Sequence, residues 1–162
     1  MRNNRRDKTR AGPLTLPERL GDTLLEEARR APGIELCGLI ASGGDATVVR
    51  YAIANRAARA ADRFDMDPAD QIAAFKRMRE RRETLIAIYH SHPVGEAEPS
   101  IHDQRGHSYP EAVAVIVAPA ARSGDMIRAW DLANEVPLER PIEWTGGRWH
   151  SATRGHKPAP GS

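Results

Sequence analysis

The chain has a single cysteine among its 162 residues, so it can form no internal disulfide and has no Cys-x-x-Cys pair for structural zinc. We expect Cys37 to be a small buried apolar residue in a reducing compartment. No apolar run approaches the ~20 residues that a membrane span requires. The arginine-rich start MRNNRRDKTR lacks the apolar segment of a signal peptide. These absences predict a cytoplasmic protein without a membrane anchor.

The chain also lacks an internal repeat, and its length suits one domain that can bury roughly two thirds of its unfolded surface. Residues 1–12 have a net charge of +4 and residues 146–162 a net charge of +3, which leaves residues 13–145 at 2 − 7 = −5. We therefore expect one acidic domain over residues 13–145 between two flexible basic tails. An acidic body argues against nucleic acid as a partner, although the tails could make weak phosphate contacts.

Hydrophobic periodicity predicts helices that alternate with strands. A helix is expected over residues 14–30, ended by Pro32-Gly33, and a second one is expected after Asp67, which can cap it ahead of Pro68. A short helix is expected over residues 100–107. Alternation of this kind predicts an α/β sandwich with a mixed sheet. The expected strands are residues 36–41, 47–53, 84–89, 111–118, 126–130 and 136–144, the last interrupted by Pro137 and Pro141 and so expected at an edge.

The stretch HSHPVGEAEPSIHD contains a candidate metal site. His90 and His92 lie two residues apart at the end of an apolar strand, so both imidazoles leave the same face. A hydrolytic zinc site uses about three protein ligands and keeps a fourth position for water. Asp103 is the candidate third ligand. His102 and His107 are rival ligands, and spacing alone does not choose among the three.

Two further positions bear on this site. Ser100 and Asp103 also have the spacing of a helix capping box, which is compatible with a metal role because capping fixes the orientation of the aspartate. A zinc hydrolase further needs a carboxylate to take a proton from zinc-bound water, whose pKa the metal lowers to about 7. Glu35, at the start of an expected strand, is the candidate base, with Glu96 and Glu98 as alternatives in a loop.

Taken together, Glu35, the sequence His-Ser-His-Pro from His90 and the later Ser-x-x-Asp ending at Asp103 resemble the JAMM (MPN-plus) metalloprotease family. The spacing matches the family motif at each position. The flanking sequences PGIELCGL and FDMDP resemble those of its small bacterial members, and the resemblance covers about residues 14–131. It implies a deaminase-like α/β/α sandwich with a mixed, curved central sheet.

The resemblance also implies an activity. It implies one zinc ion per chain, held by His90, His92 and Asp103 with water in the fourth position. Glu35 would act as general base and then as general acid, and Ser100 would stabilise the oxyanion. The implied reaction is hydrolysis of the amide bond after the C-terminal Gly-Gly of a ubiquitin-like or sulfur-carrier protein, for example from cysteine or lysine. Such a carrier would be the partner, and its tail could bind as an added strand.

Other functions are compatible with parts of the pattern. A RadC-like protein of the same fold would read His-Asn-His-Pro-Ser-Gly where this chain reads His-Ser-His-Pro-Val-Gly. A zinc deaminase needs a pair of cysteines for its metal, and this chain has one. A non-catalytic MPN-type scaffold has no need of Glu35, Ser100 and the three candidate ligands together.

Overall fold

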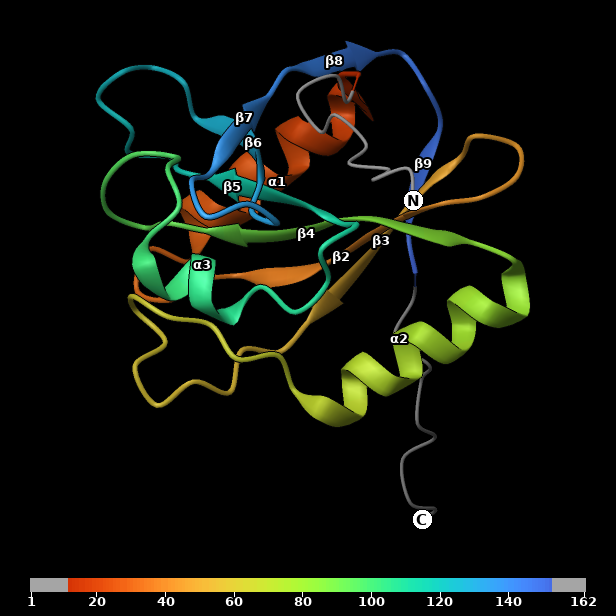
Figure 1. Ribbon diagram of the computed structural model, residues 1–162, viewed down its shortest axis with the longest axis horizontal. Helices are drawn as coiled ribbons and strands as arrows, with labels where there is room; N and C mark the ends of the chain where they lie inside the picture. The colour runs from red at the N-terminus through yellow and green to blue at the C-terminus, as the bar shows by residue number, and fades with distance from the viewer. Residues whose placement is uncertain (1–11, 153–162) are drawn as a thin grey trace, which may run out of the picture.

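The computed structural model describes residues 12–152. The elements of this part of the chain, in order, are β1 (Leu14–Pro17), α1 (Glu18–Arg30), β2 (Cys37–Ser42), β3 (Val48–Ile53), α2 (Pro68–Arg81), β4 (Thr84–Ser91), α3 (Ile101–Gly106), β5 (Val113–Val117), β6 (Ile127–Asp131), β7 (Leu138–Arg140), β8 (Ile142–Thr145) and β9 (Trp149–Ser151). Figure 1 shows their arrangement. No helix within residues 12–152 is both long enough and apolar enough to cross a membrane.

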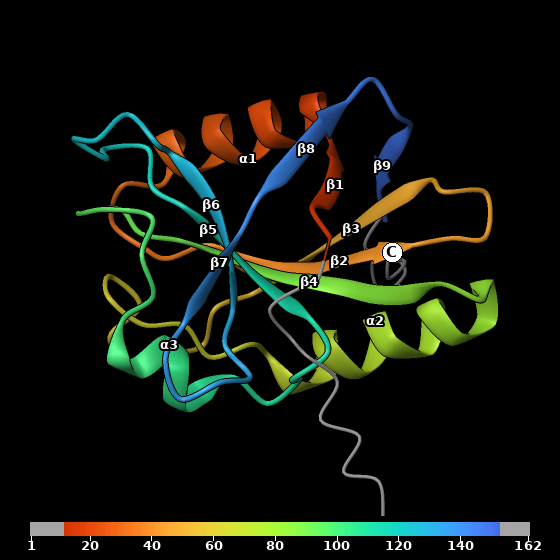
Figure 2. The same cartoon turned by 45° about the horizontal axis from the view of Figure 1, so that its top comes forward.

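The main sheet has seven strands in the order β7-β6-β5-β4-β2-β3-β9. The β4–β5 and β3–β9 pairs are parallel and the remaining pairs are antiparallel, so the sheet is mixed. Helix α1 lies on one side of this sheet, and α2 and α3 lie on the other (Figure 2). The expected α/β/α sandwich with a mixed sheet is confirmed.

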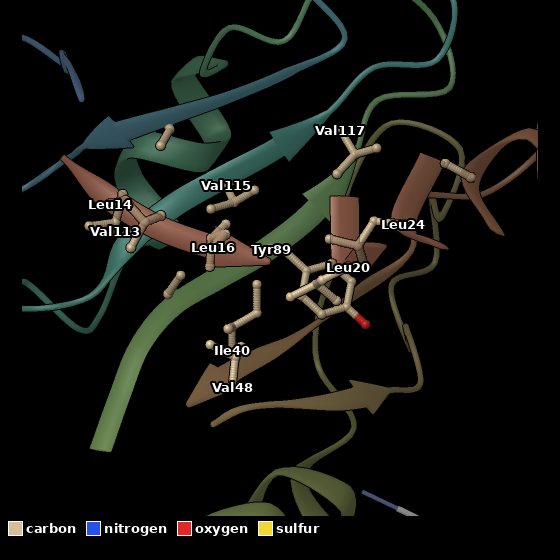
Figure 3. Close-up of a cluster of buried hydrophobic side chains, with 13 residues drawn as sticks. Leu14, Leu16, Leu20, Leu24, Ile40, Val48, Tyr89, Val113, Val115 and Val117 are labelled. Atoms are coloured by element: carbon tan, nitrogen blue, oxygen red, sulfur yellow. The ribbon is translucent and has the colours of Figure 1, made fainter. Parts of the chain in front are cut away.

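One face of the sheet packs against α1, β1 and β8 through an apolar cluster (Figure 3), beside which buried Arg50 of β3 pairs with Glu27 of α1. Gly21 lets α1 approach β8 closely, because a Cβ at this position would lie 2.8 Å from the ring of Trp144 in β8. We call this cluster the α1-side core. Its buried members are Leu14, Leu16, Leu20, Leu24, Ala28, Ile40, Val48, Ala87, Tyr89, Val113, Val115, Val117 and Ala129.

The second helix agrees closely with its local signals. The Asp67 carboxylate accepts a hydrogen bond of 3.0 Å from the Asp70 amide, and Pro68 is the first helical residue, as expected. The opposite sheet face packs on this helix through a second apolar cluster that includes Cys37 and Met78. Burial raises the pKa of the Cys37 thiol to about 12, so the thiol stays protonated there as a small core residue.

The first helix begins later than predicted. Leu14–Pro17 form a strand, β1, which pairs in parallel with β8 in register Leu14 to Ile142, and α1 starts at Glu18. The leucine spacing fits a helix equally well, but the partner strand lies near the other end of the described chain. Pairing with this distant strand therefore overrides the local helical pattern.

The C-terminal part also departs from the prediction. The single strand expected over residues 136–144 is divided at Pro141 into β7 and β8, which belong to different sheets. Trp149–Ser151 form β9, which extends the sheet at β3 beyond the domain end expected at residue 145. Trp149 also packs against the α1-side core, which gives this polar segment an anchor. The remaining tail residues, 1–11 and 153–162, lie outside the described residues.

Candidate metal centre

The end of β4 carries both histidines of the expected site. His90 is buried between β2 and β5, opposite Cys37 and Ile116, and the His92 amide donates a hydrogen bond of 2.8 Å to the Val117 carbonyl. The intervening Ser91 exchanges two hydrogen bonds with Leu36, through its amide (2.9 Å) and its hydroxyl (2.8 Å). The strand end is thus held on both sides, which fixes the two imidazoles.

Asp103 reaches the same place from α3. The Ser100 hydroxyl accepts a hydrogen bond of 3.1 Å from the Asp103 amide, and the Ser100 amide donates one of 2.8 Å to Asp103 Oδ2. These two bonds form a complete capping box. The expected capping interaction is therefore present, and it aims the aspartate at the histidines as predicted.

The three side chains converge on one point. His90 Nε2 and His92 Nε2 are 3.1 Å apart, and each lies 3.1 Å from an oxygen of Asp103. Tetrahedral zinc with ligands at about 2.0–2.2 Å places neighbouring ligand atoms about 3.3–3.6 Å apart. The donor set and its spacing therefore fit a zinc ion with only small movements. No other group of three or more histidine, cysteine or acidic side chains among residues 12–152 converges in this way.

The charges of the cluster suit a cation. Burial lowers the pKa of His90, which favours the neutral imidazole that a metal requires. Burial alone would raise the pKa of Asp103, but hydrogen bonds from His90 and His92 outweigh it and lower that pKa below its usual range. Asp103 is therefore an anion with two imidazoles against it, a suitable arrangement for a divalent cation.

The backbone also sets the tautomer of His92. Its Nδ1 lies 3.0 Å from the Glu96 carbonyl oxygen, which can only accept a hydrogen bond. Nδ1 therefore donates its proton to this carbonyl, so the neutral ring that a metal requires would present the lone pair of Nε2 to the cluster. Burial would lower the pKa of His92, but the hydrogen bonds to Asp103 and to the Glu96 carbonyl raise it overall.

Glu35 lies beside the three candidate ligands. It is 4% exposed, and its Oε1 is 4.0 Å from His92 Nε2, while its Oε2 has no hydrogen-bond partner. Burial, opposed by the charge of His92, raises the pKa of Glu35 to about 7. A carboxyl with this pKa can take and return a proton near neutral pH. We call Glu35, His90, His92 and Asp103 the metal-site cluster.

The rival residues lie elsewhere. His102 is exposed, and His107 is outside the converging group. The Glu96 carboxylate accepts hydrogen bonds from the Arg122 amide and the Ser123 hydroxyl. The Glu98 carboxylate pairs with Arg128. Neither loop glutamate therefore faces the cluster as an alternative base.

Asn55 is a residue of the site that the sequence analysis did not single out. Its amide donates hydrogen bonds to the carbonyls of Glu35 (3.0 Å) and Arg63 (2.9 Å), and its Oδ1 accepts from the amides of Ala57 and Asp65, both at 3.0 Å. All of its hydrogen-bonding groups are therefore used. Asn55 ties a long loop to the backbone of the candidate base.

Phe64 in that loop was quoted only as part of FDMDP and was given no role. Its ring stacks on His90 with the centroids 4.6 Å apart and the planes inclined by 24°. A backbone bridge between Asn55 and Met66 closes the loop at its base. The available signals are an asparagine two residues after a strand and the aromatic residue that begins FDMDP, but neither identifies its partner.

Two hollows flank the cluster. The first, which we call the Glu35 groove, is lined by Glu35, His92 and Ser100. Its other lining residues are Gly33, residues 58–62, Pro93, Val94, Glu96, Glu98 and Pro99. The second, which we call the α3 cavity, lies on the side of His90 and Asp103. Its other lining residues include Arg63, Phe64, Gln71, His107, Tyr109 and Leu132.

The fold and the cluster define an α/β domain built around a His-x-His and aspartate ligand set, with a buried glutamate beside it. The sequence matches the family described as prokaryotic homologs of the JAB domain over residues 17–133. The chain belongs to this family, and the predicted relationship to JAMM-type proteins is confirmed.

Individual relatives agree with this assignment. The chain is 27% identical over 124 residues to the CysO-cysteine peptidase of Mycobacterium tuberculosis, an overlap of 76% of this chain and 85% of the relative. The solution structure of protein DSY2949 from Desulfitobacterium hafniense has a TM-score of 0.70 at 26% identity and covers 83% of this chain and 94% of its own. A Salinibacter ruber protein shares the fold, with a TM-score of 0.53 at 22% identity and coverages of 90% and 95%.

Proposed function

We propose that this chain is a zinc-dependent peptidase or isopeptidase that hydrolyses the amide bond after the C-terminal Gly-Gly of a ubiquitin-like or sulfur-carrier protein. The observation that carries the proposal is the convergence of three side chains, with each pair of nearest ligand atoms 3.1 Å apart, beside a buried glutamate oxygen that lacks a partner. Membership of the JAB family supports a hydrolase. The name of the mycobacterial relative supports a sulfur carrier as the substrate.

The proposed cofactor is one zinc ion per chain, held by His90, His92 and Asp103. When bound, zinc would supply a Lewis acid for the scissile carbonyl and lower the pKa of a water molecule in the site to about 7. The buried, mostly pre-oriented donors suit this ion, since two neutral imidazoles and one carboxylate are ligands that zinc prefers.

Glu35 and Ser100 perform the proton transfers and hydrogen bonding in this proposal. Glu35 takes a proton from the attacking water while the oxygen of that water forms a bond to the carbonyl carbon. The carbon–nitrogen bond then breaks, and Glu35 returns the proton to the departing amine. The Ser100 hydroxyl accepts its hydrogen bond from Asp103 and keeps its own proton, which it can donate to the carbonyl oxygen.

The Glu35 groove is the proposed path of the carrier tail. The catalytic side chains Glu35 and Ser100 both line it, so a chain lying there presents its carbonyl to both. A Gly-Gly end has no side chains to hinder its entry into the groove. The chain of the substrate can then approach the cluster through main-chain contacts.

The test combines metal content with hydrolysis. Protein purified without chelator is expected to contain one zinc per chain and to cleave a carrier whose Gly-Gly end is linked to cysteine or to a lysine side chain. Glu35→Gln should keep the zinc and lose about 10²–10⁴-fold in kcat. Glu26→Gln, which changes an exposed glutamate on α1, is the matched control. Sub-stoichiometric zinc, or an undiminished rate in Glu35→Gln, would contradict the proposal.

A further inference from the structure

The α3 cavity and the Glu35 groove adjoin different members of the ligand set. His90 and Asp103 line the cavity, whereas Glu35, His92 and Ser100 line the groove. With the acyl part of a substrate in the groove, the α3 cavity is the second hollow that adjoins the ligands. The α3 cavity is therefore placed to receive what leaves as the amine.

Arg63 gives this cavity a cationic group without an acidic partner. Its Nε is buried and has no hydrogen-bond partner, and no ion pair joins its guanidinium to any acid among residues 12–152. Two acidic residues line the cavity, Asp103 and Asp65. Asp65 is exposed and does not pair with Arg63. A half-buried guanidinium with unused donors is a site for an anion, above all for a carboxylate that can bind two of its N–H groups.

Two neighbouring groups add hydrogen-bonding capacity. The Tyr109 hydroxyl accepts a bond of 3.1 Å from Gln71 Nε2, so its own proton remains available to donate. His107 Nε2 is buried without a partner. Phe64 and Leu132 provide an apolar wall beside these polar groups. The cavity thus combines donors for an anion with a surface for a small side chain.

The volume of the cavity limits its occupant. It is about 250 Å³, slightly below the roughly 300–1,000 Å³ of typical small-molecule pockets. A single amino acid suits this space, and the surface of a folded protein does not. An α-amino acid places its carboxylate one carbon from the scissile nitrogen, whereas a lysine side chain inside a protein has no carboxylate near that nitrogen.

We propose that the leaving group is a single α-amino acid with a free carboxylate, and that Arg63 binds this carboxylate in the α3 cavity. The inference rests on the proposed function and narrows it to one kind of amine. Arg63 is thereby a specificity-determining residue. Its position in the chain supports this role, since the next residue, Phe64, stacks on the candidate ligand His90.

The experiment removes the carboxylate charge and the arginine separately and together. A carrier whose Gly-Gly end is linked to cysteine is compared with the same carrier linked to cysteinamide, using the zinc-loaded wild-type protein and Arg63→Gln. Amidation should lower kcat/KM about 10- to 100-fold in the wild type and less than about 3-fold in Arg63→Gln. Arg30→Gln, which changes an exposed arginine on α1, should keep the wild-type preference.

The possible outcomes separate the inference about Arg63 from the proposed function. Equal cleavage of both substrates by the wild type, or an equal amidation effect in Arg63→Gln, overturns the inference and leaves the proposed function standing. Cleavage of neither substrate by zinc-loaded wild-type protein overturns both. If Arg63→Gln fails to fold, Arg63→Lys replaces it, because a point charge without the planar fork should reduce the preference for the free carboxylate. An unchanged preference in Arg63→Lys at unchanged kcat/KM would then overturn the inference.

Discussion

The α1-side core and the metal-site cluster lie against the same sheet, but the first consists of apolar side chains and the second of ionisable ones. The core consists of apolar side chains, of which Leu20 and Val115 have no exposed surface. The cluster buries two imidazoles and two carboxyl groups, and one carboxyl oxygen has no partner. Burial of the first kind stabilises the fold, and burial of the second kind costs free energy until a cation neutralises it.

Strand β4 shows both kinds of burial on its two faces. Ala87 and Tyr89 point into the α1-side core, while Ile88 and His90 point to the opposite face, since side chains alternate along a strand. The strand is therefore anchored by one face and presents the metal ligand with the other. Stability and chemistry should be separable by mutation, and the following predictions test this separation.

The largest effect is expected in the core. Leu20→Ala removes a fully buried side chain from the α1-side core and should lower the free energy of unfolding by about 3–5 kcal/mol. The zinc content of the remaining folded protein should not change. Urea unfolding and metal analysis measure the two quantities. A loss of zinc at a temperature where the variant is folded would show that the two regions are coupled.

The next effect concerns the stability of the metal-free protein, which should depend on pH through Glu35. Since burial raises the pKa of Glu35 from 4.5 to about 7, the stability it contributes is fully present below pH 4.5 and is lost as the pH rises through 7. Metal-free Glu35→Gln should therefore be more stable than the wild type by about 3 kcal/mol at pH 8, a difference that shrinks toward pH 5. Urea unfolding in EDTA across this range is the measurement.

The same titration series needs a control for general charge effects. Glu26→Gln removes an exposed carboxylate from α1 and should leave the pH dependence as in the wild type. A stability difference for Glu35→Gln that stays constant between pH 5 and pH 8 would mean that the buried carboxyl is not the source.

A somewhat smaller effect is expected on zinc affinity. Asp103→Asn keeps a hydrogen-bond acceptor for the Ser100 amide but removes the charged ligand. The dissociation constant for zinc should rise at least about 100-fold, because even the loss of an outer-shell partner costs about 10–100-fold. Competition with a chelating dye measures it, and His150→Ala, on β9, is a control histidine. Unchanged affinity in Asp103→Asn would remove this residue from the ligand set.

The smallest expected effect tests the loop that Asn55 ties to the backbone of Glu35. Asn55→Ala removes the hydrogen bond to the Glu35 carbonyl and three others that order the loop. With zinc content unchanged, kcat should fall about 10-fold, since the base is less firmly positioned. A rise in KM with an unchanged kcat would instead assign Asn55 to substrate binding.

The parts of the fold that the sequence predicted are those with local signals. Asp67 and Pro68 start α2 through contacts within one turn, so their effect can be read without a partner. Leu14–Pro17 have a strand partner near the other end of the described chain, and β9 pairs with β3 over a similar span. Periodicity holds no information about such pairing, which explains why both were misassigned.

The candidate site follows the same rule. His90, His92 and Asp103 were linked by a motif with fixed spacing, and the structure brings them together. Asn55 and Phe64 act through a loop whose closure depends on the bridge to Met66. Their contacts exist only after the loop has folded over the candidate base. No residue-type rule for single positions could have assigned them.

The pairing of β1 with β8 has a consequence for how the chain folds. Leu14 meets Ile142 across nearly the whole described chain, so this contact has a high contact order and a large loop-closure entropy. During synthesis, β1 has no partner strand until the last part of the domain emerges. Residues 35–103, which contain the whole metal-site cluster, are made earlier. We therefore expect the α1 side to close last, after the ligands have been brought together.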